Sequence, residues 1–449
     1  MVTITPFVDE GLGNSSYLVE IGDRRGLVVD PPRDIRRFLA HAADRRIGLS
    51  HSLETHLHAD FVSGSRELAA GGAQILAPRD ARLGYDHTGL EDDRDFDLGG
   101  LRLRPIATPG HTPEHLGYLL LDGDQPVALF SGGALLPGGV GRTDLIAPEQ
   151  TELLARSLYR ALQERVLALP DELPVYPTHG AGSFCSTPSG GERMTTIGRE
   201  RATNPLLNAG SEDEFVRLLV VGLGSYPTYF RRLREVNRRG PRVYGEPPSL
   251  PSLTIDELDR RIEAGAELVD VRPIAAFAAG HIPGALSIEL RPAFASWLGW
   301  LVPFERPVVF IVALRQDRRE LVRQALGIGY ERLEGELEGG IETWIGAGRP
   351  VATTTLTTTI HLDRRLLVDV RQASEYRSGH VPGTTAIELG DLAATAMGNL
   401  GPDAVFMCGH GERAMTAASL AERSGRAATV LLGGPRDWAR QTGGSLVRQ

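Results

Sequence analysis

Cysteine is scarce in this chain of 449 residues, which contains only Cys185 and Cys408. Two cysteines so far apart do not make a disulfide scaffold, so a reducing cytoplasm is the expected compartment. Long apolar runs are also missing, since none approaches the roughly 18 residues of a membrane-spanning helix. The N-terminal residues lack the basic region and apolar core of a signal peptide, so we expect neither a membrane segment nor secretion.

A basic excess is absent as well. Lys and Arg number 48 against 57 Asp and Glu, and the net charge of −9 disfavours non-specific nucleic-acid binding. The hydrophobic content of 41% and the charged content of 23% are those of a globular protein. The length leaves room for about three domains, each large enough to bury a core. We therefore expect a multidomain protein without nucleic-acid or membrane partners.

The segment from Thr55 to Phe61 organises the first half of the chain. In it His56, His58 and Asp60 occupy alternate positions, directly after the apolar stretch 47–53. A loop that leaves a strand in this way points nitrogen and oxygen ligands into one cleft, which is how a transition-metal site is built. The segment therefore predicts a metal site.

Two further histidines follow expected strands. His111 stands in a Pro-Gly turn after the alternating stretch 101–107, and His179 comes shortly after 174–176. Strands followed by a mixed strand and helix pattern fit an α/β fold of the αββα sandwich type, with the site at the strand ends. The expected strands are 16–21, 26–29, 74–77, 101–107, 116–121, 126–130 and 174–176, and the expected helices are 34–45, 65–70 and 149–169.

These motifs resemble the metallo-β-lactamase superfamily, whose signature is His-x-His-x-Asp-His, although Phe61 replaces the last His. Residues 1–245 look like the persulfide dioxygenases of that superfamily. The stretches that carry this likeness include Glu54-Thr55-His56, Pro109-Gly110-His111-Thr112 and Gly141-Arg142-Thr143-Asp144. The resemblance implies one Fe(II) per chain, held by two His and one Asp, with Zn as the alternative metal. His56 and His111 would be the histidine ligands.

The third ligand of that pattern is missing. The family reads Gly-Asp-Ala-Leu where this chain has Gly133 in the Asp position. Ferrous iron prefers an anionic oxygen among its ligands, so we expect weaker iron binding than in other members. Three outcomes stay open: Asp60 replaces the carboxylate, an exogenous anion or the substrate fills the gap, or the site is degenerate and only binds a persulfide. His58, Asp60 and His179 are predicted to support the metal or to substitute as ligands.

Cys185 and Arg142 are assigned to the substrate region. Cys185 follows the small residues of Gly180-Ala181-Gly182, which allow a substrate to approach the backbone. The resemblance places a cysteine near the cleft, but buried filler is an equally good interpretation of Cys185. For Asp144, next to Arg142 in the same motif, a hydrogen bond that fixes the loop is favoured over metal binding.

The second half contains an internal repeat. Leu268-Val269-Asp270-Val271-Arg272 returns as Leu367-Val368-Asp369-Val370-Arg371, and each string is followed by Gly-His-Ile/Val-Pro-Gly. A repeat of this length means two copies of one fold, and alternating strands and helices predict parallel sheets with helices on both faces. The strings resemble rhodanese domains. We name residues 254–350 the first copy and residues 355–449 the second copy.

Activity in the second copy is predicted at Cys408. The loop Cys408, Gly409, His410, Gly411, Glu412, Arg413 joins an expected strand, 404–407, to an expected helix, 414–423. A helix N-terminus and loop N–H groups favour thiolate and later a bound persulfide, and Arg413 would steer an anion such as thiosulfate. The order Cys-x-x-Gly-x-Arg is similar to the rhodanese active loop. The first copy has Val312 at the cysteine position and is predicted to be inactive.

The sequence therefore predicts an enzyme of sulfide detoxification that handles a low-molecular-weight thiol persulfide, thiosulfate or sulfite, as a homo-oligomer. The first domain would oxidise a persulfide to sulfite, and a Cys408 persulfide would exchange sulfur with sulfite, thiosulfate or a thiol. Three alternatives remain: a sulfurtransferase with a metal-free degenerate first domain, a thioester hydrolase like glyoxalase II, and a non-enzymatic persulfide sensor. The hydrolase normally needs two metals, which Phe61 and Gly133 argue against.

Overall fold

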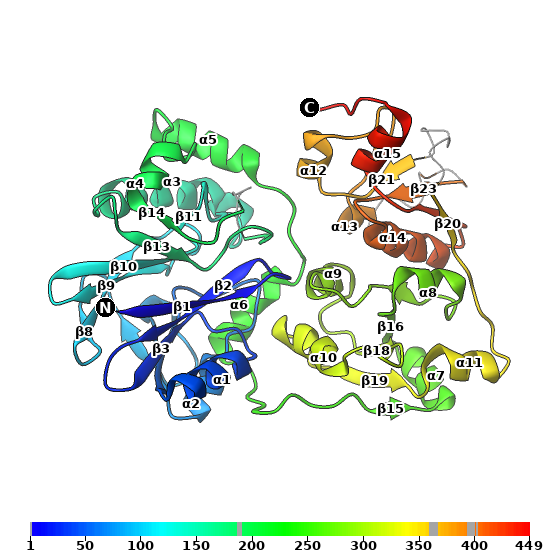
Figure 1. The fold of residues 1–449 in the computed structure, drawn as a ribbon, viewed down its shortest axis with the longest axis horizontal. Coiled ribbons are helices and arrows are strands. Elements are labelled where there is room, and N and C mark those ends of the chain that lie inside the picture. The colour runs from blue at the N-terminus through cyan, green and yellow to red at the C-terminus, as the bar shows by residue number, and fades with distance from the viewer. Residues whose placement is uncertain (1, 186–190, 359–366, 393–399, 401–402) are drawn as a thin grey trace. The chain divides into compact units, whose positions relative to one another are not determined.

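The computed structural model describes residues 2–185, 191–358, 367–392, 400 and 403–449. The chain divides into two compact units (Figure 1). The first unit is formed by residues 1–247 with 326–329, and the second by residues 248–325 with 330–449. Within the described ranges, no helix has the length and apolar character needed to cross a membrane.

The first unit is built on two sheets that pack face to face (Figure 1). One sheet has the strand order β1-β2-β3-β4-β5-β6, with bounds Thr3–Asp9, Asn14–Glu20, Arg25–Val29, Gly48–Leu53, Gln74–Pro78 and Thr88–Leu90. The other has the order β14-β13-β10-β9-β8-β7, with bounds Thr195–Thr196, Pro174–Pro177, Gln125–Gly132, Leu116–Asp122, Leu101–Ala107 and Phe96–Asp97. A short hairpin, β11 (Leu135–Leu136) and β12 (Gly139–Val140), lies beside the second sheet.

Alternating apolar residues fill the space between these sheets, where Tyr17, Leu103, Tyr118 and Phe130 are buried. Burial of each such side chain stabilises the fold by about 1.5–3 kcal/mol. The helices of this unit are α1 (Arg36–Arg45), α2 (Ser65–Ala70), α3 (Thr151–Ala161), α4 (Ile197–Thr203), α5 (Glu212–Gly222) and α6 (Phe230–Arg239).

Helices cover the outer face of each sheet. Phe38 of α1 packs with Leu18 and Val28 on the first sheet, whereas Leu158 of α3 lies in the core on the outer face of the second. The order helix, sheet, sheet, helix confirms the predicted αββα sandwich. The expected helix 149–169 is divided, because α3 is preceded by a 3₁₀ turn, Pro148–Gln150, and followed by a π-helical turn, Leu162–Val166.

The second unit contains two parallel sheets, as the repeat predicts. The first has the order β15-β19-β18-β16-β17, with bounds Ser252–Leu253, Leu333–Leu337, Val308–Ile311, Glu267–Asp270 and Leu286–Ser287. The second has the order β20-β24-β23-β21-β22, with bounds Thr355–Thr357, Thr429–Leu431, Val405–Met407, Leu367–Asp369 and Thr385–Ala386. The helices are α7 (Ile255–Glu263), α8 (Ile274–Ala279), α9 (Phe294–Leu301), α10 (Arg318–Gly327), α11 (Gly340–Gly346), α12 (Ala373–Ser378), α13 (Leu389–Asp391), α14 (Glu412–Arg423) and α15 (Pro435–Thr442).

Helix α14 joins the two copies. The His281 Nε2 lies 2.8 Å from Glu422 Oε2. Thr416 donates its hydroxyl to the Ser287 carbonyl at 2.7 Å, and the Ser287 N–H donates to Ser419 Oγ at 3.1 Å. These groups are largely buried, so leaving them unpaired would cost about 1–3 kcal/mol each. The helix that follows the Cys408 loop is therefore held by the first copy.

Candidate functional site

Three imidazoles meet at one edge of the sandwich. His56 follows β4, His111 follows β8 and His179 follows β13, and all three are buried. One ring nitrogen from each lies within 4.8 Å of the others. We call this group the three-imidazole cluster. Loops from both sheets deliver it. His179, which the sequence analysis assigns as a supporting or substitute ligand, lies beside His56 and His111.

Hydrogen bonds fix the tautomers of two of these rings. The Nδ1 of His111 lies 2.8 Å from the Arg142 carbonyl oxygen, which can only accept, so His111 carries its proton on Nδ1. The Nδ1 of His179 lies 3.0 Å from the Asn14 side-chain oxygen and donates in the same way. Each ring therefore keeps a lone pair on Nε2.

The His56 ring is set by a relay. The Thr55 hydroxyl donates to the Asp30 carboxylate at 2.8 Å, so it accepts the proton of His56 Nδ1, also at 2.8 Å. The Nε2 atoms of His56 and His179 are then only 3.4 Å apart, with a lone pair on each. His111 Nε2 is buried and has no hydrogen-bond partner among the residues that the structure describes.

These lone pairs fit a divalent transition metal. Burial lowers the pKa of His56 and of His111 well below the usual range, and the neighbouring imidazoles lower it further. Neutral imidazoles are common metal ligands, and two nitrogens bound to one zinc ion lie about 3.3 Å apart. Uncompensated lone pairs at such distances would repel. The donor set therefore suits a bound cation and contains no anionic oxygen.

Glycine at position 133 leaves room for the His111 ring. A Cβ atom there would touch His111 Cδ2 and lie only 2.7 Å from Cγ and 2.9 Å from Nε2. On the other side of the ring, a Cβ at Gly141 would lie 2.8 Å from His111 Nδ1. The ring therefore occupies a slot whose two walls are glycines.

His115 is a site residue that sequence reasoning missed. Its Nδ1 lies 2.8 Å from Thr108 Oγ1, and its Nε2 accepts the Gly133 N–H at 2.9 Å. Its ring stacks on His56 with centroids 4.9 Å apart, and burial lowers the pKa of His115 to about 3. Because both nitrogens are in use, His115 holds the glycine turn in place. A further histidine shortly after His111 was the signal available in the sequence.

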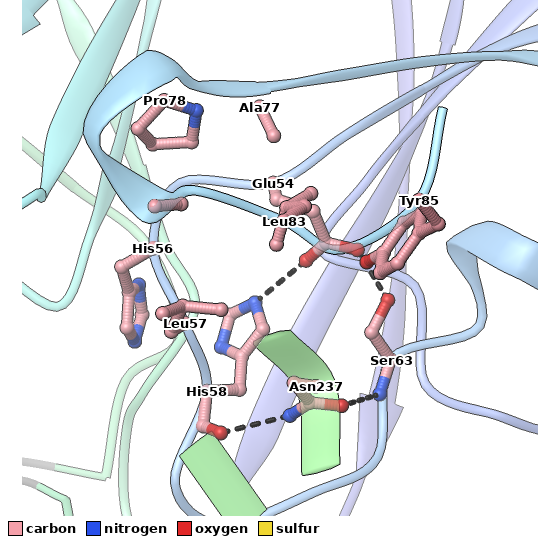
Figure 2. Close-up of a pocket in the computed structure, with 11 residues that line it drawn as sticks. Glu54, His56, Leu57, His58, Ser63, Ala77, Pro78, Leu83, Tyr85 and Asn237 are labelled. Atoms are coloured by element: carbon pink, nitrogen blue, oxygen red, sulfur yellow. Dashed lines mark hydrogen bonds and ion pairs between the residues drawn. The ribbon is translucent and has the colours of Figure 1, made fainter. Parts of the chain in front are cut away.

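His58 points away from the cluster. Figure 2 shows its ring turned toward Glu54, beside a small cavity. Its Nε2 lies 3.0 Å from Glu54 Oε2 and 3.2 Å from Asp30 Oδ1. Burial alone would lower the pKa of His58, but the two carboxylates raise it to about 10. Phe61 stacks on the ring at 4.2 Å. His58 is thus a buried cation, and the structure places it outside the cluster.

Asp60 lies behind His179. Its Oδ2 accepts a hydrogen bond from the Asn14 amide at 2.8 Å and is 3.4 Å from His179 Nδ1. Burial would raise the pKa of Asp60, but the neighbouring His179 helps to lower it to about 2. Burial, and then the nearby Asp60 carboxylate, raises the pKa of Cys185 well above the usual range. Cys185 is therefore a protonated, unreactive thiol as placed.

Arg142 braces the loops around the cluster. Its guanidinium pairs with both Asp144 oxygens at 2.7 and 2.8 Å, and Nη1 donates to the Phe184 carbonyl at 2.8 Å. Its Cζ lies 4.2 Å from the Tyr226 ring centroid. The Arg142 guanidinium is thus paired with Asp144 inside the protein, and the Arg142 carbonyl orients His111.

Cys408 sits between β23 and α14 in the second unit. The Gly411 N–H donates to its Sγ at 3.1 Å, and the sulfur is buried. Gly411 has φ of 117°, a left-handed conformation that glycine adopts without strain. A Cβ at Gly434 would lie 2.8 Å from the Cys408 carbonyl oxygen, so the neighbouring chain passes close to this loop. His410 is exposed.

Arg413 is paired with Glu375, a residue that the sequence did not single out. Its Nη1 and Nη2 donate to the two carboxylate oxygens at 2.6 and 2.9 Å. Burial alone would lower the pKa of Arg413, but Glu375 and the nearby Cys408 raise it. Trp297 of the first copy lies under the guanidinium at 5.9 Å. An incoming anion would therefore meet an arginine already shared with a carboxylate.

The corresponding loop of the first copy is closed by its own side chains. In the first copy the Val271 N–H donates to the Ile311 carbonyl, and in the second the Val370 N–H donates to the Met407 carbonyl. Ile311 therefore corresponds to Met407, and Val312 to Cys408. Gln316 accepts the Ala313 N–H at 2.8 Å. The Arg318 Nη1 lies within 3.0 Å of carbonyl oxygens of Ala313, Leu314 and Gln316.

A cysteine introduced into this loop should remain inactive. We expect Val312→Cys in the Cys408→Ser background to show no thiosulfate sulfurtransfer above that background, because Gln316 and Arg318 already occupy backbone groups of this loop. The matched variant adds Gln316→Gly to open the loop. Steady-state sulfurtransfer measures the outcome, and activity from Val312→Cys without that opening would contradict it.

Comparisons with known proteins cover both units. A family model for the rhodanese-like domain matches residues 254–347 and 354–441. The mitochondrial persulfide dioxygenase ETHE1 of Homo sapiens is 30% identical over 210 residues, which are 44% of this chain and 74% of that protein. A hydroxyacylglutathione hydrolase of Pseudomonas entomophila (strain L48) is 34% identical over 163 residues, 36% of this chain and 60% of the hydrolase. A crystal structure of a metallo-beta-lactamase from Staphylococcus aureus subsp. aureus COL matches with a TM-score of 0.65 and 27% identity, covering 75% of this chain and 98% of that one.

Proposed function

Because this chain belongs to the persulfide dioxygenase family, in the form fused to rhodanese-like domains, we propose that it oxidises a thiol persulfide in its first unit and transfers sulfane sulfur in its second. The first unit would take a low-molecular-weight persulfide, and the second would exchange sulfur with thiosulfate or sulfite. The protein would act in the cytoplasm. One observation supports this above the others: the same chain carries converging imidazole lone pairs and a cysteine sulfur held by a loop amide.

In the first unit, His56 and His111 would hold Fe(II), with Zn as the alternative metal. Bound iron supplies the binding and activation of dioxygen. The protein's own groups orient the ligands, since Thr55 fixes His56 and the Arg142 carbonyl fixes His111. The overall conversion balances as one persulfide, one dioxygen and one water giving one thiol, one sulfite and two protons.

In the second unit, the Cys408 thiolate attacks the outer sulfur of a donor. With thiosulfate, the sulfur–sulfur bond of the donor breaks, sulfite leaves with the electron pair, and Cys408 becomes a persulfide. A thiol or sulfite then attacks the outer sulfur of that persulfide and releases the Cys408 thiolate. The Gly411 N–H stabilises the anionic sulfur, and Arg413 offers positive charge beside it.

Oxygen uptake tests the first half of this function. We expect protein loaded with Fe(II) under anaerobic conditions to consume oxygen when glutathione persulfide is added, and His111→Ala to lower that rate by about a hundredfold or more, because an iron ligand is lost. An oxygen electrode measures the rate, and thiosulfate sulfurtransfer by the same variant serves as the control and should persist. No uptake with the persulfides of glutathione and coenzyme A, with sulfurtransfer intact, would leave a sulfurtransferase alone.

The hydrolase relatives favour a thioester hydrolase as the second candidate, but this chain spans only 60% of the Pseudomonas entomophila enzyme. Phe61 supplies no metal ligand and instead stacks on His58, and Gly133 supplies no carboxylate to bridge two metals. Hydrolysis of an acyl-glutathione thioester by the zinc-loaded protein, without oxygen uptake, would favour this candidate.

A further inference from the structure

We propose that the first unit binds one divalent metal ion through three imidazoles, those of His56, His111 and His179, and that Gly133 is the residue that makes this arrangement fit. This inference rests on the proposed metal-dependent function of the same site. On this inference, the absence of a carboxylate at position 133 does not leave the site open, because the His111 ring fills the space beside Gly133.

The first step is the direction of the His179 ring. Its Nδ1 faces the Asn14 oxygen at 3.0 Å and Asp60 at 3.4 Å, both acceptors, so its free lone pair lies on Nε2. That nitrogen is 3.4 Å from His56 Nε2. A carboxylate behind a histidine that points at a metal raises the basicity of the ligand and fixes its orientation. Asp60 is therefore a positioning residue for His179.

The second step concerns the alternative ligands. The Nε2 of His58 already contacts the carboxylates of Glu54 and Asp30, whereas His115 has hydrogen-bond partners on both nitrogens. His115 therefore has no nitrogen left for the metal. His58 keeps an unpartnered, buried Nδ1, but among the described residues His58 groups with Asp60 and His179 and not with His56 and His111. Within the described part of the chain, His111 Nε2 is buried without a hydrogen-bond partner. A ligand on this atom would satisfy it, because a buried acceptor without a partner is unfavourable.

The third step is the space at position 133. Any side chain there would meet the His111 ring, with its Cβ 2.9 Å from the nitrogen that would bind the metal. An aspartate at this position and the His111 ring in its present place are therefore incompatible. Two arrangements of the same loop follow, one with a carboxylate and a displaced ring, and one with glycine and three imidazoles. This chain has the residues of the second.

Metal titration tests the ligand set without any turnover. Full-length protein is freed of metal with a chelator and titrated with Co(II) in the absence of oxygen, following the visible absorption bands and competition with a chromophoric chelator. We expect His179→Ala to weaken cobalt binding by more than about 100-fold and to change the bands. Free imidazole should restore both in His179→Gly, because it refills the cavity. His51→Asn, which removes a buried ring that contacts Phe96 and lies outside the ligand set, should stay within about tenfold of the wild type.

Gly133→Asp gives the opposite test. If a carboxylate were the missing ligand, this variant would bind metal more tightly; we expect weaker binding, because the new side chain displaces the His111 ring. Gly133→Ala adds only the clashing Cβ and should also weaken binding, and circular dichroism of the metal-free variants separates this effect from unfolding. Unchanged binding by His179→Ala or Gly133→Ala, or tighter binding by Gly133→Asp, would overturn the inference.

The proposed function fails separately. A three-imidazole site without oxygen uptake would overturn the dioxygenase proposal and leave the ligand set standing. Oxygen uptake with unaltered cobalt binding in His179→Ala would support the dioxygenase and overturn the ligand set.

Discussion

Cys408→Ser should lower thiosulfate sulfurtransfer at least about a thousandfold, since the reaction needs a sulfur nucleophile that forms and breaks a sulfur–sulfur bond. The Gly411 amide that lies 3.1 Å from the sulfur would remain, as would the Arg413 pair with Glu375. The loss would therefore come from the nucleophile itself and not from a collapsed loop. Steady-state transfer to cyanide or glutathione measures the rate, and intact mass shows whether one sulfur atom is gained.

Cys185→Ala is the matched control, because it removes the other cysteine of the chain. Its thiol is buried against Asp60, which raises its pKa, so the variant should still gain one sulfur on exposure to thiosulfate. Turnover by Cys408→Ser above about a tenth of the wild-type rate would show that another group carries the sulfur. Stoichiometric labelling of Cys408 without turnover would instead favour a persulfide sensor.

Asp30→Ala should destabilise the first unit by about 3–5 kcal/mol, the usual cost of removing one partner of a buried ion pair. Asp30 is fully buried and accepts hydrogen bonds from the Thr55 N–H at 2.7 Å, the Thr55 hydroxyl at 2.8 Å and the Thr178 hydroxyl. It also faces the His58 cation. The carboxylate thus links the ends of β3, β4 and β13. Asp30→Asn keeps the shape without the charge and should lose less stability.

The chain provides its own reference for this measurement. All of its tryptophans, Trp297, Trp300, Trp344 and Trp438, belong to the second unit, so their fluorescence follows that unit alone. Urea unfolding followed by fluorescence should be unchanged in Asp30→Ala. Hydrogen exchange of the amides in 14–30 and 48–58 should report the loss. An effect below about 1 kcal/mol, or an equal shift of the fluorescence transition, would show that Asp30 does not hold this unit together.

Local sequence patterns predicted most of the framework. The strand 101–107 and the helix 65–70 were predicted at the observed positions, because alternation and helical spacing are properties of neighbouring residues. The αββα sandwich and the parallel sheets could be predicted from the same local patterns, and the structure confirms both. The helix 149–169 was predicted as one element, although it is interrupted by a π-helical turn that its apolar spacing does not reveal.

The contacts that decide the chemistry join distant residues, and the sequence could not supply them. Glu375 precedes its partner Arg413 by 38 positions in the sequence, and Asn14 contacts His179, which lies 165 positions later. Gly133 could be recognised as a departure from a pattern. Only the structure shows that the His111 ring fills the space where a side chain at position 133 would lie, because the sequence does not give three-dimensional contacts.

The attachment of α14 to the first copy has a consequence for how the protein comes apart. The sequence repeats as two domains, yet the two copies form one compact unit, and the helix that starts at the Cys408 loop is bonded to the first copy through Glu422, Ser419 and Thr416. We therefore expect the two copies to unfold together and not at the boundary of the repeat. Removing the first copy would take these hydrogen bonds away from α14, so the repeat is modular in sequence while its stability is shared between the two copies.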